Sequence, residues 1–389
     1  MPQHPDRLYL DWNATAPLNA AARSAAIDAM TAGGNASSVH AEGRAARALV
    51  ETVRRQLGQR FGVSAEAVTF TSGGTEANAM ALSPGAVCGA GGPAERLIVS
   101  AVEHPAVSAG GRFAPDAITV VPVDAEGVVD LDALLQALDG TPALVSIMAA
   151  NNETGVLQPL GEIARLVRAA GGVFHTDAVQ AFGRVADADL VADLVTVSGH
   201  KIGAPTGVGA LVRRGMATVP ALISGGGQER GARGGTENVA AIAGLGAALK
   251  SAAANADGWA DTRFARDQFE AALAETFPKA NIFAKGAPRL PNTSLFSPGE
   301  IPAEISLIGL DMAGVAVSSG AACSSGSVKP SHVLAAMGVP EAVARTALRV
   351  SAGPAGAEAA FQRFLLALRD VIVPMEGRSI ARRGPTYGL

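Results

Sequence analysis

Near its middle the chain reads Leu194-Val195-Thr196-Val197-Ser198-Gly199-His200-Lys201, an apolar run that passes through a small polar turn to a lysine. The run predicts a short buried strand, and the ends of such strands are where open α/β sheets bind ligands. Lys201 is the only lysine in the first 249 residues, where arginine otherwise carries the positive charge. Unlike arginine, lysine can lose its proton and form a Schiff base with an aldehyde. The alternative is a lysine on a surface loop, so the surrounding residues must decide.

Similar apolar runs recur through the first half of the chain. They lack strict alternation, which is typical of strands that are covered on both faces. Helical segments lie between them; one of these, 159–167, begins with a proline and is followed by Gly171. The alternation of strand and helix predicts an α/β fold with a mostly parallel sheet covered by helices. The other predicted strands are 68–71, 97–100, 118–122, 144–149, 172–175 and 209–212.

The pattern changes after about residue 255. Helical segments dominate from there on, with short strand-like pieces near Ser294 and Val315. We therefore predict a large domain over 15–255 and a smaller α+β domain made of 1–14 together with 256–389.

Composition limits the classes of function. The chain has 389 residues, of which 48% are hydrophobic, so it can bury a sizeable core. Its net charge of −4 gives no field for binding nucleic acid or an anionic membrane. No apolar run reaches the length of a membrane span, and the N-terminus lacks the pattern of a secretion signal. Two cysteines, Cys88 and Cys323, make neither a disulfide framework nor a zinc site. We expect a cytoplasmic protein with no metal site.

The segment 71–78, Thr-Ser-Gly-Gly-Thr-Glu-Ala-Asn, follows one predicted strand and opens a helix. Glycines such as Gly74 let the backbone approach a ligand closely, and free N–H groups at a helix start favour a phosphate. An ordinary turn with Thr75 as the helix cap explains the segment equally well.

Three further strand ends carry polar side chains. Asp177 can keep a pyridinium nitrogen protonated, or it can cap a helix. His104 can stack on a flat cofactor and exchange protons, or bond within its own loop. Asn152 can donate to a substrate, or belong to an ordinary turn. Because the ends of parallel strands lie on one edge of a sheet, we predict that these three residues and Lys201 share one cleft, suited to pyridoxal phosphate (PLP).

Two more residues invite a functional interpretation. Cys323 lies in a run of Ser, Gly and Ala over about 318–328, which predicts a mobile loop on which a thiolate can act as a nucleophile. The alternative is a small buried residue in a turn. Arg349 lies within a strand-like run, where its fork suits a carboxylate or points to solvent from an edge strand. Cys88 has apolar neighbours and no polar partner nearby in sequence, so we interpret it as structural.

With these motifs the chain strongly resembles the cysteine desulfurases of NifS/IscS type. These form a branch of the class V aminotransferase family, which has the fold of type I PLP-dependent transferases. The resemblance covers nearly the whole chain, with the motifs in order. The matching segments are 10–15, 35–40, 71–76, 103–107, 151–155, 175–180, 198–201, 225–230, 233–238, the Cys323 run and 331–334.

The resemblance implies a role for each matched residue. Lys201 carries PLP as a Schiff base, Asp177 holds the pyridine nitrogen, Gln180 holds the ring hydroxyl, and His104 stacks on the ring and assists proton transfer. Cys323 accepts the sulfur. Cofactor contacts are further implied for Gly74, Thr75, Ser198 and His200, the last three at the phosphate; for Thr236 at the phosphate of the other subunit of a homodimer; and substrate contacts for Asn13, Asn152 and Arg349.

The implied activity converts L-cysteine to L-alanine and leaves a persulfide on Cys323, from which sulfur passes to an acceptor such as an iron–sulfur scaffold protein. The chain departs from the family pattern at Trp12, at 202–207 and in a short tail after Arg349, which leaves the acceptor open. A plain aminotransferase needs no thiol, and a non-catalytic relative would lack Lys201, Asp177 or Cys323. The sequence does not distinguish a cysteine desulfurase from a selenocysteine-specific lyase.

Overall fold

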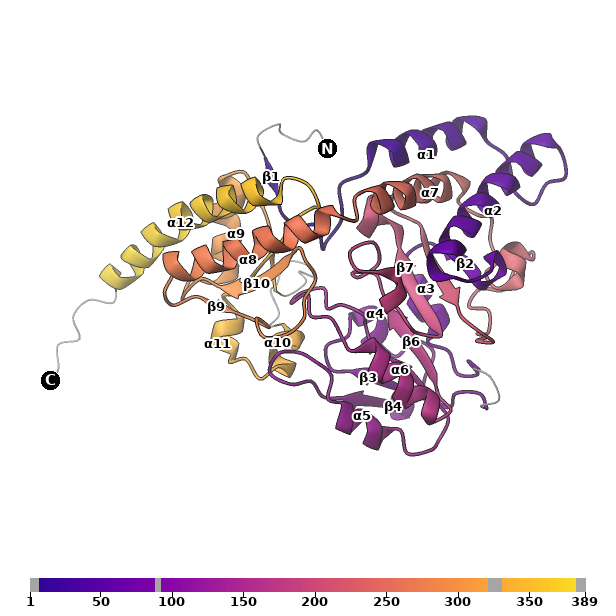
Figure 1. Ribbon diagram of the computed structural model, residues 1–389, viewed down its shortest axis with the longest axis horizontal. Coiled ribbons are helices and arrows are strands. Elements are labelled where there is room, and N and C mark those ends of the chain that lie inside the picture. Colours follow the sequence, from indigo (N-terminus) through magenta and orange to yellow (C-terminus); the bar gives the residue numbers. More distant parts are fainter. Residues whose placement is uncertain (1–6, 88–91, 321–330, 383–389) are drawn as a thin grey trace.

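A seven-stranded sheet forms the centre of the computed structural model, which describes residues 7–87, 92–320 and 331–382 (Figure 1). Its strand order is β2-β8-β7-β6-β5-β3-β4. β7, β6, β5, β3 and β4 run parallel, whereas β8 is antiparallel to both of its neighbours. The predicted α/β class with a mostly parallel sheet is confirmed. The strands are β2 (Val68–Thr71), β3 (Arg96–Ser100), β4 (Ile118–Val121), β5 (Ala143–Ser146), β6 (Val173–Asp177), β7 (Leu194–Ser198) and β8 (Gly209–Arg213).

Successive residues of the central strands enter different hydrophobic clusters, as the pleat requires. In β3, Ile98 packs in the cluster that includes residues of α2, α5, α6 and α7, while Leu97 and Val99 pack in the cluster of α3. Both faces are therefore buried, which explains why the strands read as continuous apolar runs. The helices named here are α2 (Ala41–Phe61), α3 (Gly74–Ala81), α5 (Leu131–Ala137), α6 (Leu160–Ala169) and α7 (Val239–Ala254).

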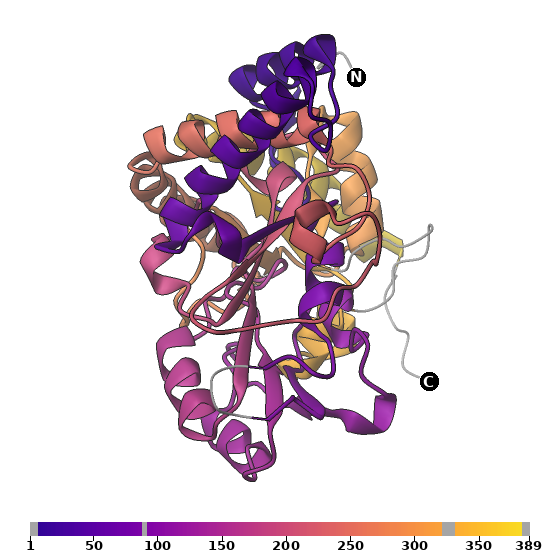
Figure 2. The same cartoon turned by 90° about the vertical axis from the view of Figure 1, so that its right-hand side faces the viewer.

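The N-terminal helix α1 (Ala20–Ala32) packs against α7 at one end of the molecule (Figures 1 and 2). Asn19 caps α1, and its side chain accepts from the N–H groups of Ala21 and Ala22. Ile27 and Met30 on this helix are exposed.

A second group of elements follows α7. A four-stranded sheet has the order β12-β13-β10-β9, and β1 pairs with β11. Leu8 and Leu10 pack in the same hydrophobic cluster as residues between 265 and 372. The two chain ends thus meet in one layer, although the domain limits at 14 and 255 stay a prediction. These elements are β1 (Leu8–Tyr9), α8 (Gly258–Thr276), β9 (Asn281–Ile282), β10 (Thr293–Ser297), α9 (Ala303–Met312), β11 (Val315–Ala316), β12 (Ser318–Ser319), α10 (His332–Ala336), α11 (Glu341–Ala344), β13 (Leu348–Ser351) and α12 (Ala357–Arg382).

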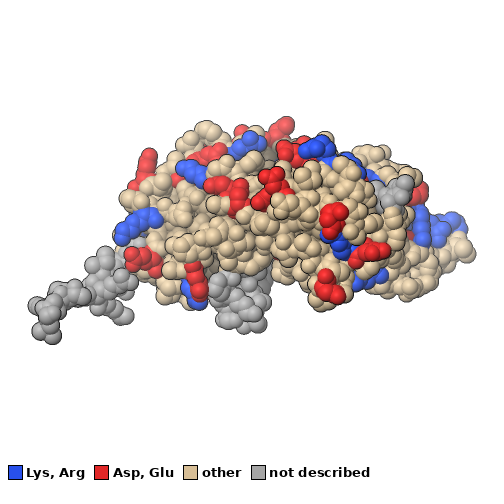
Figure 3. Space-filling view, turned by 90° about the horizontal axis from the view of Figure 1, so that it is seen from below, with Lys and Arg blue, Asp and Glu red and all other residues tan. Residues whose placement is uncertain are grey.

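The surface carries charges of both signs, interspersed on the face shown in Figure 3. Within the described ranges, no single helix is both long and apolar enough to cross a bilayer; α7 and α8 reach that length and composition only as a pair bent by 69°. The described residues also contain no group of three or more His, Cys, Asp or Glu side chains that could hold a metal ion.

Candidate active site

A cavity of about 430 Å³ lies at the carboxyl ends of the parallel strands. This size is typical of a site for a small organic molecule. His104, Asn152, Asp177 and Lys201 all line it, as expected from the parallel sheet. Its lining is completed by Asn13, Ala14, Gly74, Thr75, Asn78, Ala106, Met148, Ala150, Val179, Gln180, Ser198, His200, Ser318 and Arg349.

Lys201 lies in a short 3-10 turn, Gly199–Ile202, directly after β7. Its Nζ donates to the carbonyl oxygens of Asn13 at 2.5 Å and Ala14 at 3.0 Å. Burial lowers the pKa of Lys201 to about 7, with the positive charges of Arg184 and Arg349 adding to the effect. A substantial fraction of this amine is therefore neutral near pH 7, as Schiff-base chemistry requires.

Asp177 ends β6, and each of its carboxylate oxygens has a fixed donor. Oδ1 accepts from the Val179 N–H at 2.9 Å, and Oδ2 accepts from Asn78 Nδ2 at 2.7 Å. Asn78 is 1% exposed, and no described residue forms a hydrogen bond with its own Oδ1. Asn78 belongs to the quoted 71–78 segment, but sequence reasoning did not single it out. The signal was its place one helical turn after the glycines.

The start of α3 suits an anion. The helix is capped by Gly73 without any side-chain hydrogen bond, so the alternative that Thr75 is the cap is wrong. A Cβ atom on Gly74 would lie 2.7 Å from Val179 Cγ2, which explains the glycine there. Burial lowers the pKa of nearby His200 to about 4, with Lys201 and Arg184 adding to this, so His200 is neutral. The N–H groups at the start of a helix, together with a neutral His200, suit a phosphate.

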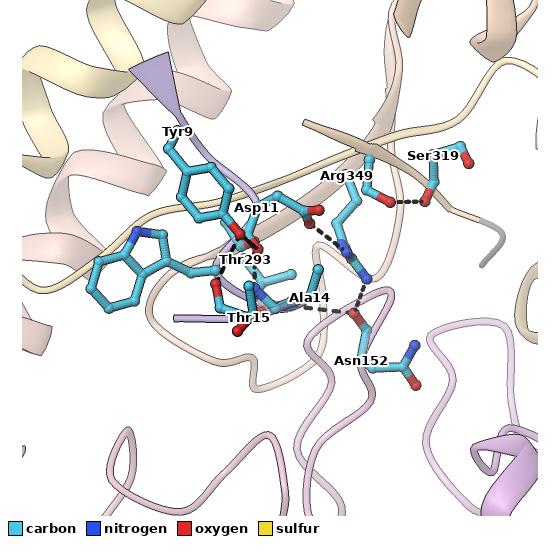
Figure 4. Close-up of polar contacts among 12 residues, drawn as sticks. Tyr9, Asp11, Ala14, Thr15, Asn152, Thr293, Ser319 and Arg349 are labelled. Atoms are coloured by element: carbon cyan, nitrogen blue, oxygen red, sulfur yellow. Dashed lines mark hydrogen bonds and ion pairs between the residues drawn. The ribbon is translucent and has the colours of Figure 1, made fainter. Parts of the chain in front are cut away.

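Arg349 lies on β13, between β12 and β10, so the alternative of an edge-strand arginine pointing to solvent is wrong. It is 7% exposed, and its guanidinium bonds to Asp11 Oδ1 at 2.7 Å and to the carbonyl oxygen of Asn152 at 2.8 Å (Figure 4). Its buried Nε has no hydrogen-bond partner among the described residues. Arg349 therefore brings a positive fork to the cavity.

The two asparagines of the 151–155 turn have different surroundings. Asn151 stabilises the turn, because its Oδ1 accepts from the N–H groups of Glu153 and Thr154. Asn152 lines the cavity. Asn13 also lines it, but its Nδ2 already donates to Thr293 Oγ1 at 2.9 Å and to the Asn152 carbonyl at 3.3 Å. The Asn13 side chain therefore connects the N-terminal segment to β10 and to the 151–155 turn. Its predicted contact with the substrate stays a prediction.

His104 caps α4 (Pro105–Ser108), with its Nδ1 accepting from the Ala106 N–H at 3.1 Å. One ring nitrogen therefore forms a hydrogen bond within its own loop, as the alternative interpretation expected. The ring also lines the cavity. Burial lowers the pKa of His104. A neutral ring suits stacking on a flat cofactor.

Glu103, directly before His104, is fully buried. Its Oε1 accepts from Ser100 Oγ at 2.6 Å and from the Met148 N–H at 2.9 Å, while its Oε2 has no partner within the described ranges. Burial raises the pKa of Glu103 from 4.5 to about 8, against the lowering effect of these two hydrogen bonds. The native protein thus binds this proton more tightly than the unfolded chain does.

Glu103→Gln is expected to flatten the pH dependence of stability. The wild type has this contribution in full below pH 4.5, the unfolded pKa, and loses it as pH rises through about 8. The variant does not titrate, so its stability relative to the wild type should increase with pH. Urea unfolding of both proteins at about pH 5 and about pH 9 measures this, and parallel profiles would contradict the assignment.

Thr236 does not line the cavity of its own chain; it is exposed on the loop before α7. Two other residues singled out in the sequence, Cys88 and Cys323, lie outside the described residues. Ser318, on the strand that precedes Cys323, does line the cavity. Ser331, which follows the Cys323 segment in the sequence, donates its hydroxyl hydrogen to the buried Glu153 carboxylate at 2.5 Å.

The residues fit PLP. An amine of lowered pKa, a carboxylate held by Asn78 and Val179, and an anion-binding helix start line the same cavity. These groups match the aldehyde, the ring nitrogen and the phosphate of that cofactor.

Comparison with known proteins agrees with this geometry. Residues 8–364 match the model of the aminotransferase class-V family. The cysteine desulfurase of Gluconacetobacter diazotrophicus is 40% identical, over 98% of this chain and 99% of that protein. A NifS-like protein from Rickettsia africae has a TM-score of 0.83 at 34% identity, over 94% of this chain and 99% of that one. The structure of SspA in complex with cysteine has a TM-score of 0.72 at 27% identity, over 89% and 99%. The chain therefore belongs to the aminotransferase class-V family, in the branch that contains the NifS-like cysteine desulfurases.

Proposed function

We propose that this protein is a PLP-dependent cysteine desulfurase, which converts L-cysteine to L-alanine and passes the sulfur to Cys323. One observation carries the proposal: a single cavity holds the Lys201 amine, the Asp177 carboxylate and the Arg349 fork, and is lined by Ser318 of the strand that leads to Cys323. An aminotransferase needs the first three of these but no thiol. The cysteine bound to the related SspA supports the choice of substrate.

The cavity residues provide binding and proton transfer. Arg349, whose buried Nε–H has no partner in the part of the chain that the structure describes, suits the substrate carboxylate. Bound PLP supplies an electron sink for the carbanion character that develops at Cα and Cβ of the substrate. Lys201, with a pKa of about 7, can take the Cα proton and return one to the product. Asp177, whose carboxylate is held in place by Asn78, would bind the ring nitrogen of the cofactor.

The sulfur step balances without an added oxidant. The Cys323 thiolate attacks the substrate sulfur, so that an S–S bond forms while the Cβ–S bond breaks. The electron pair of the broken bond stays with Cβ, which takes up a proton and becomes the methyl group of alanine. The transferred sulfur remains on Cys323 as a persulfide, and a thiol reductant or an acceptor protein removes it.

We propose a cytoplasmic homodimer in which Thr236, exposed on its loop, contacts the phosphate in the other subunit. The acceptor of the sulfur is proposed to be a protein of iron–sulfur cluster assembly or of another sulfur-containing cofactor pathway.

Product analysis tests the proposal. The PLP-loaded protein is incubated with L-cysteine and a thiol reductant, and alanine, sulfide, pyruvate and keto acids are quantified. We expect equal amounts of alanine and sulfide, and no reaction with L-serine, which has no sulfur to transfer. Pyruvate with ammonia would indicate a lyase, and a keto acid formed from cysteine would indicate an aminotransferase; either result overturns the proposal.

Asp177→Asn is expected to lower alanine release by at least about a hundredfold, because it removes the charge that supports the ring nitrogen. Binding of PLP should persist, since Lys201 and the α3 start remain. Steady-state turnover of this variant is compared with that of Asp189→Asn, an exposed carboxylate on another turn. Equal turnover in the two variants would remove Asp177 from its role.

A further inference from the structure

Arg184 is a buried cation in the turn segment that follows β6. It is 5% exposed, and no Asp or Glu among the described residues lies within ion-pair distance of it. Burying a charge without a counter-charge is costly, so a position where such a charge is kept calls for a reason beyond packing. Burial lowers the pKa of Arg184 to about 9, with Arg349 adding to the effect.

The hydrogen bonds of Arg184 go to residues of the cavity. Its Nη1 donates to Asn13 Oδ1 at 2.6 Å and to Gln180 Oε1 at 3.0 Å, and its Nη2 donates to the Trp12 carbonyl at 3.2 Å. Since a guanidinium has only donors, both amide side chains must turn their oxygen atoms toward it. Gln180 Nε2 then faces away, and donates to the Asn13 carbonyl at 2.9 Å. That carbonyl also accepts from Lys201.

Arg184 also lies close to Lys201. The two line a second, smaller cavity of about 100 Å³, on which Trp12 and Trp259 also lie. The charge of Arg184 disfavours the protonated form of Lys201, as does that of Arg349. Asp177 and Asp11 act in the opposite direction, and the neighbouring His104 and His200 have lowered pKa values. Among these charges, that of Arg184 has the largest effect on the pKa of Lys201.

We propose that Arg184 is a positioning residue of the active site, which holds a positive charge beside the Lys201 amine and fixes the Gln180 amide so that its NH₂ group serves as a donor. The catalytic role of Arg184 rests on the proposed function, whereas its effects on Lys201 and Gln180 can be tested without it. A donor at Gln180 suits an anionic ring oxygen, and a neutral Lys201 suits both capture of an aldehyde and removal of a proton.

The lysine-poor sequence allows a direct test. Cofactor-free protein is pulsed with acetic anhydride over a range of pH, and acetylation of Lys201 is measured by peptide mass spectrometry. The exposed Lys250, Lys279 and Lys285 serve as references within each sample. In Arg184→Met we expect the labelling midpoint of Lys201 to rise by about one pH unit, while the references stay unchanged. If the Met variant does not fold, Arg184→Gln removes the same charge and keeps an amide donor.

Two further variants complete the test. Arg266→Met removes an equally buried arginine from α8, where it bonds to the Leu290 carbonyl, and it should leave the Lys201 midpoint where it was. Arg184→Lys keeps the charge but loses the fork, so the midpoint should stay near the wild-type value while alanine release falls several-fold.

An unchanged Lys201 midpoint in Arg184→Met overturns the electrostatic part of the proposal, and undiminished turnover in Arg184→Lys overturns the positioning part. Because the labelling uses neither PLP nor cysteine, its outcome does not depend on whether the protein desulfurates cysteine.

Discussion

Lys201→Ala is expected to leave the protein colourless after incubation with PLP, and to lower alanine release from L-cysteine by at least about a thousandfold. Lys201 is the one lysine among the described residues that line the cavity. Without it, neither the Schiff base with the cofactor nor the proton transfer at Cα has a suitable group. Visible absorbance of the dialysed protein and an alanine assay measure the two losses separately.

Two controls sharpen this test. Lys250→Ala removes an exposed lysine at the end of α7 and should change neither reading. Lys201→Arg keeps a positive charge at the site but cannot form the Schiff base, so it should behave like the alanine variant. A normal visible spectrum in Lys201→Ala would show that another residue holds the cofactor.

Cys323→Ser is expected to keep the cofactor and its colour while alanine release falls to the background level. A serine hydroxyl is a far weaker nucleophile toward sulfur than a thiolate, so the Cβ–S bond is not broken. Alanine and sulfide are assayed after incubation with L-cysteine, with Cys88→Ser as the matched control that should retain activity. Alanine release from Cys323→Ser at the wild-type rate would show that Cys323 is not the sulfur acceptor.

The sequence predicted the sheet and the contents of its cleft because both depend on local patterns. All seven predicted strands of the central sheet are present, although β5 ends at Ser146 where the prediction extended to residue 149. The apolar run does continue past Ser146, and the N–H groups of Ile147 and Ala149 still donate to carbonyls of β6, but outside the regular strand. Parallel strand ends then placed His104, Asp177 and Lys201 together.

Contacts between distant segments could not be read from such patterns. Arg349 and Asp11 are 338 positions apart, yet they form an ion pair at the cavity. Asn78 holds Asp177 across 99 positions, and Arg184 meets Asn13 across 171. These side chains lie in segments whose local sequence predicts only a helix, a strand or a turn. Their partners are determined by how the layers pack, which periodicity does not encode.

The sulfur left on the enzyme after a single turnover tests the central claim most directly. PLP-loaded protein is mixed with one equivalent of L-cysteine in the absence of reductant, trapped with an alkylating agent, and digested for peptide mass spectrometry. The account predicts that the Cys323 peptide gains one sulfur atom, in an amount equal to the alanine released, and that the gain disappears with reductant. Alanine formed without any added sulfur on Cys323 would contradict it.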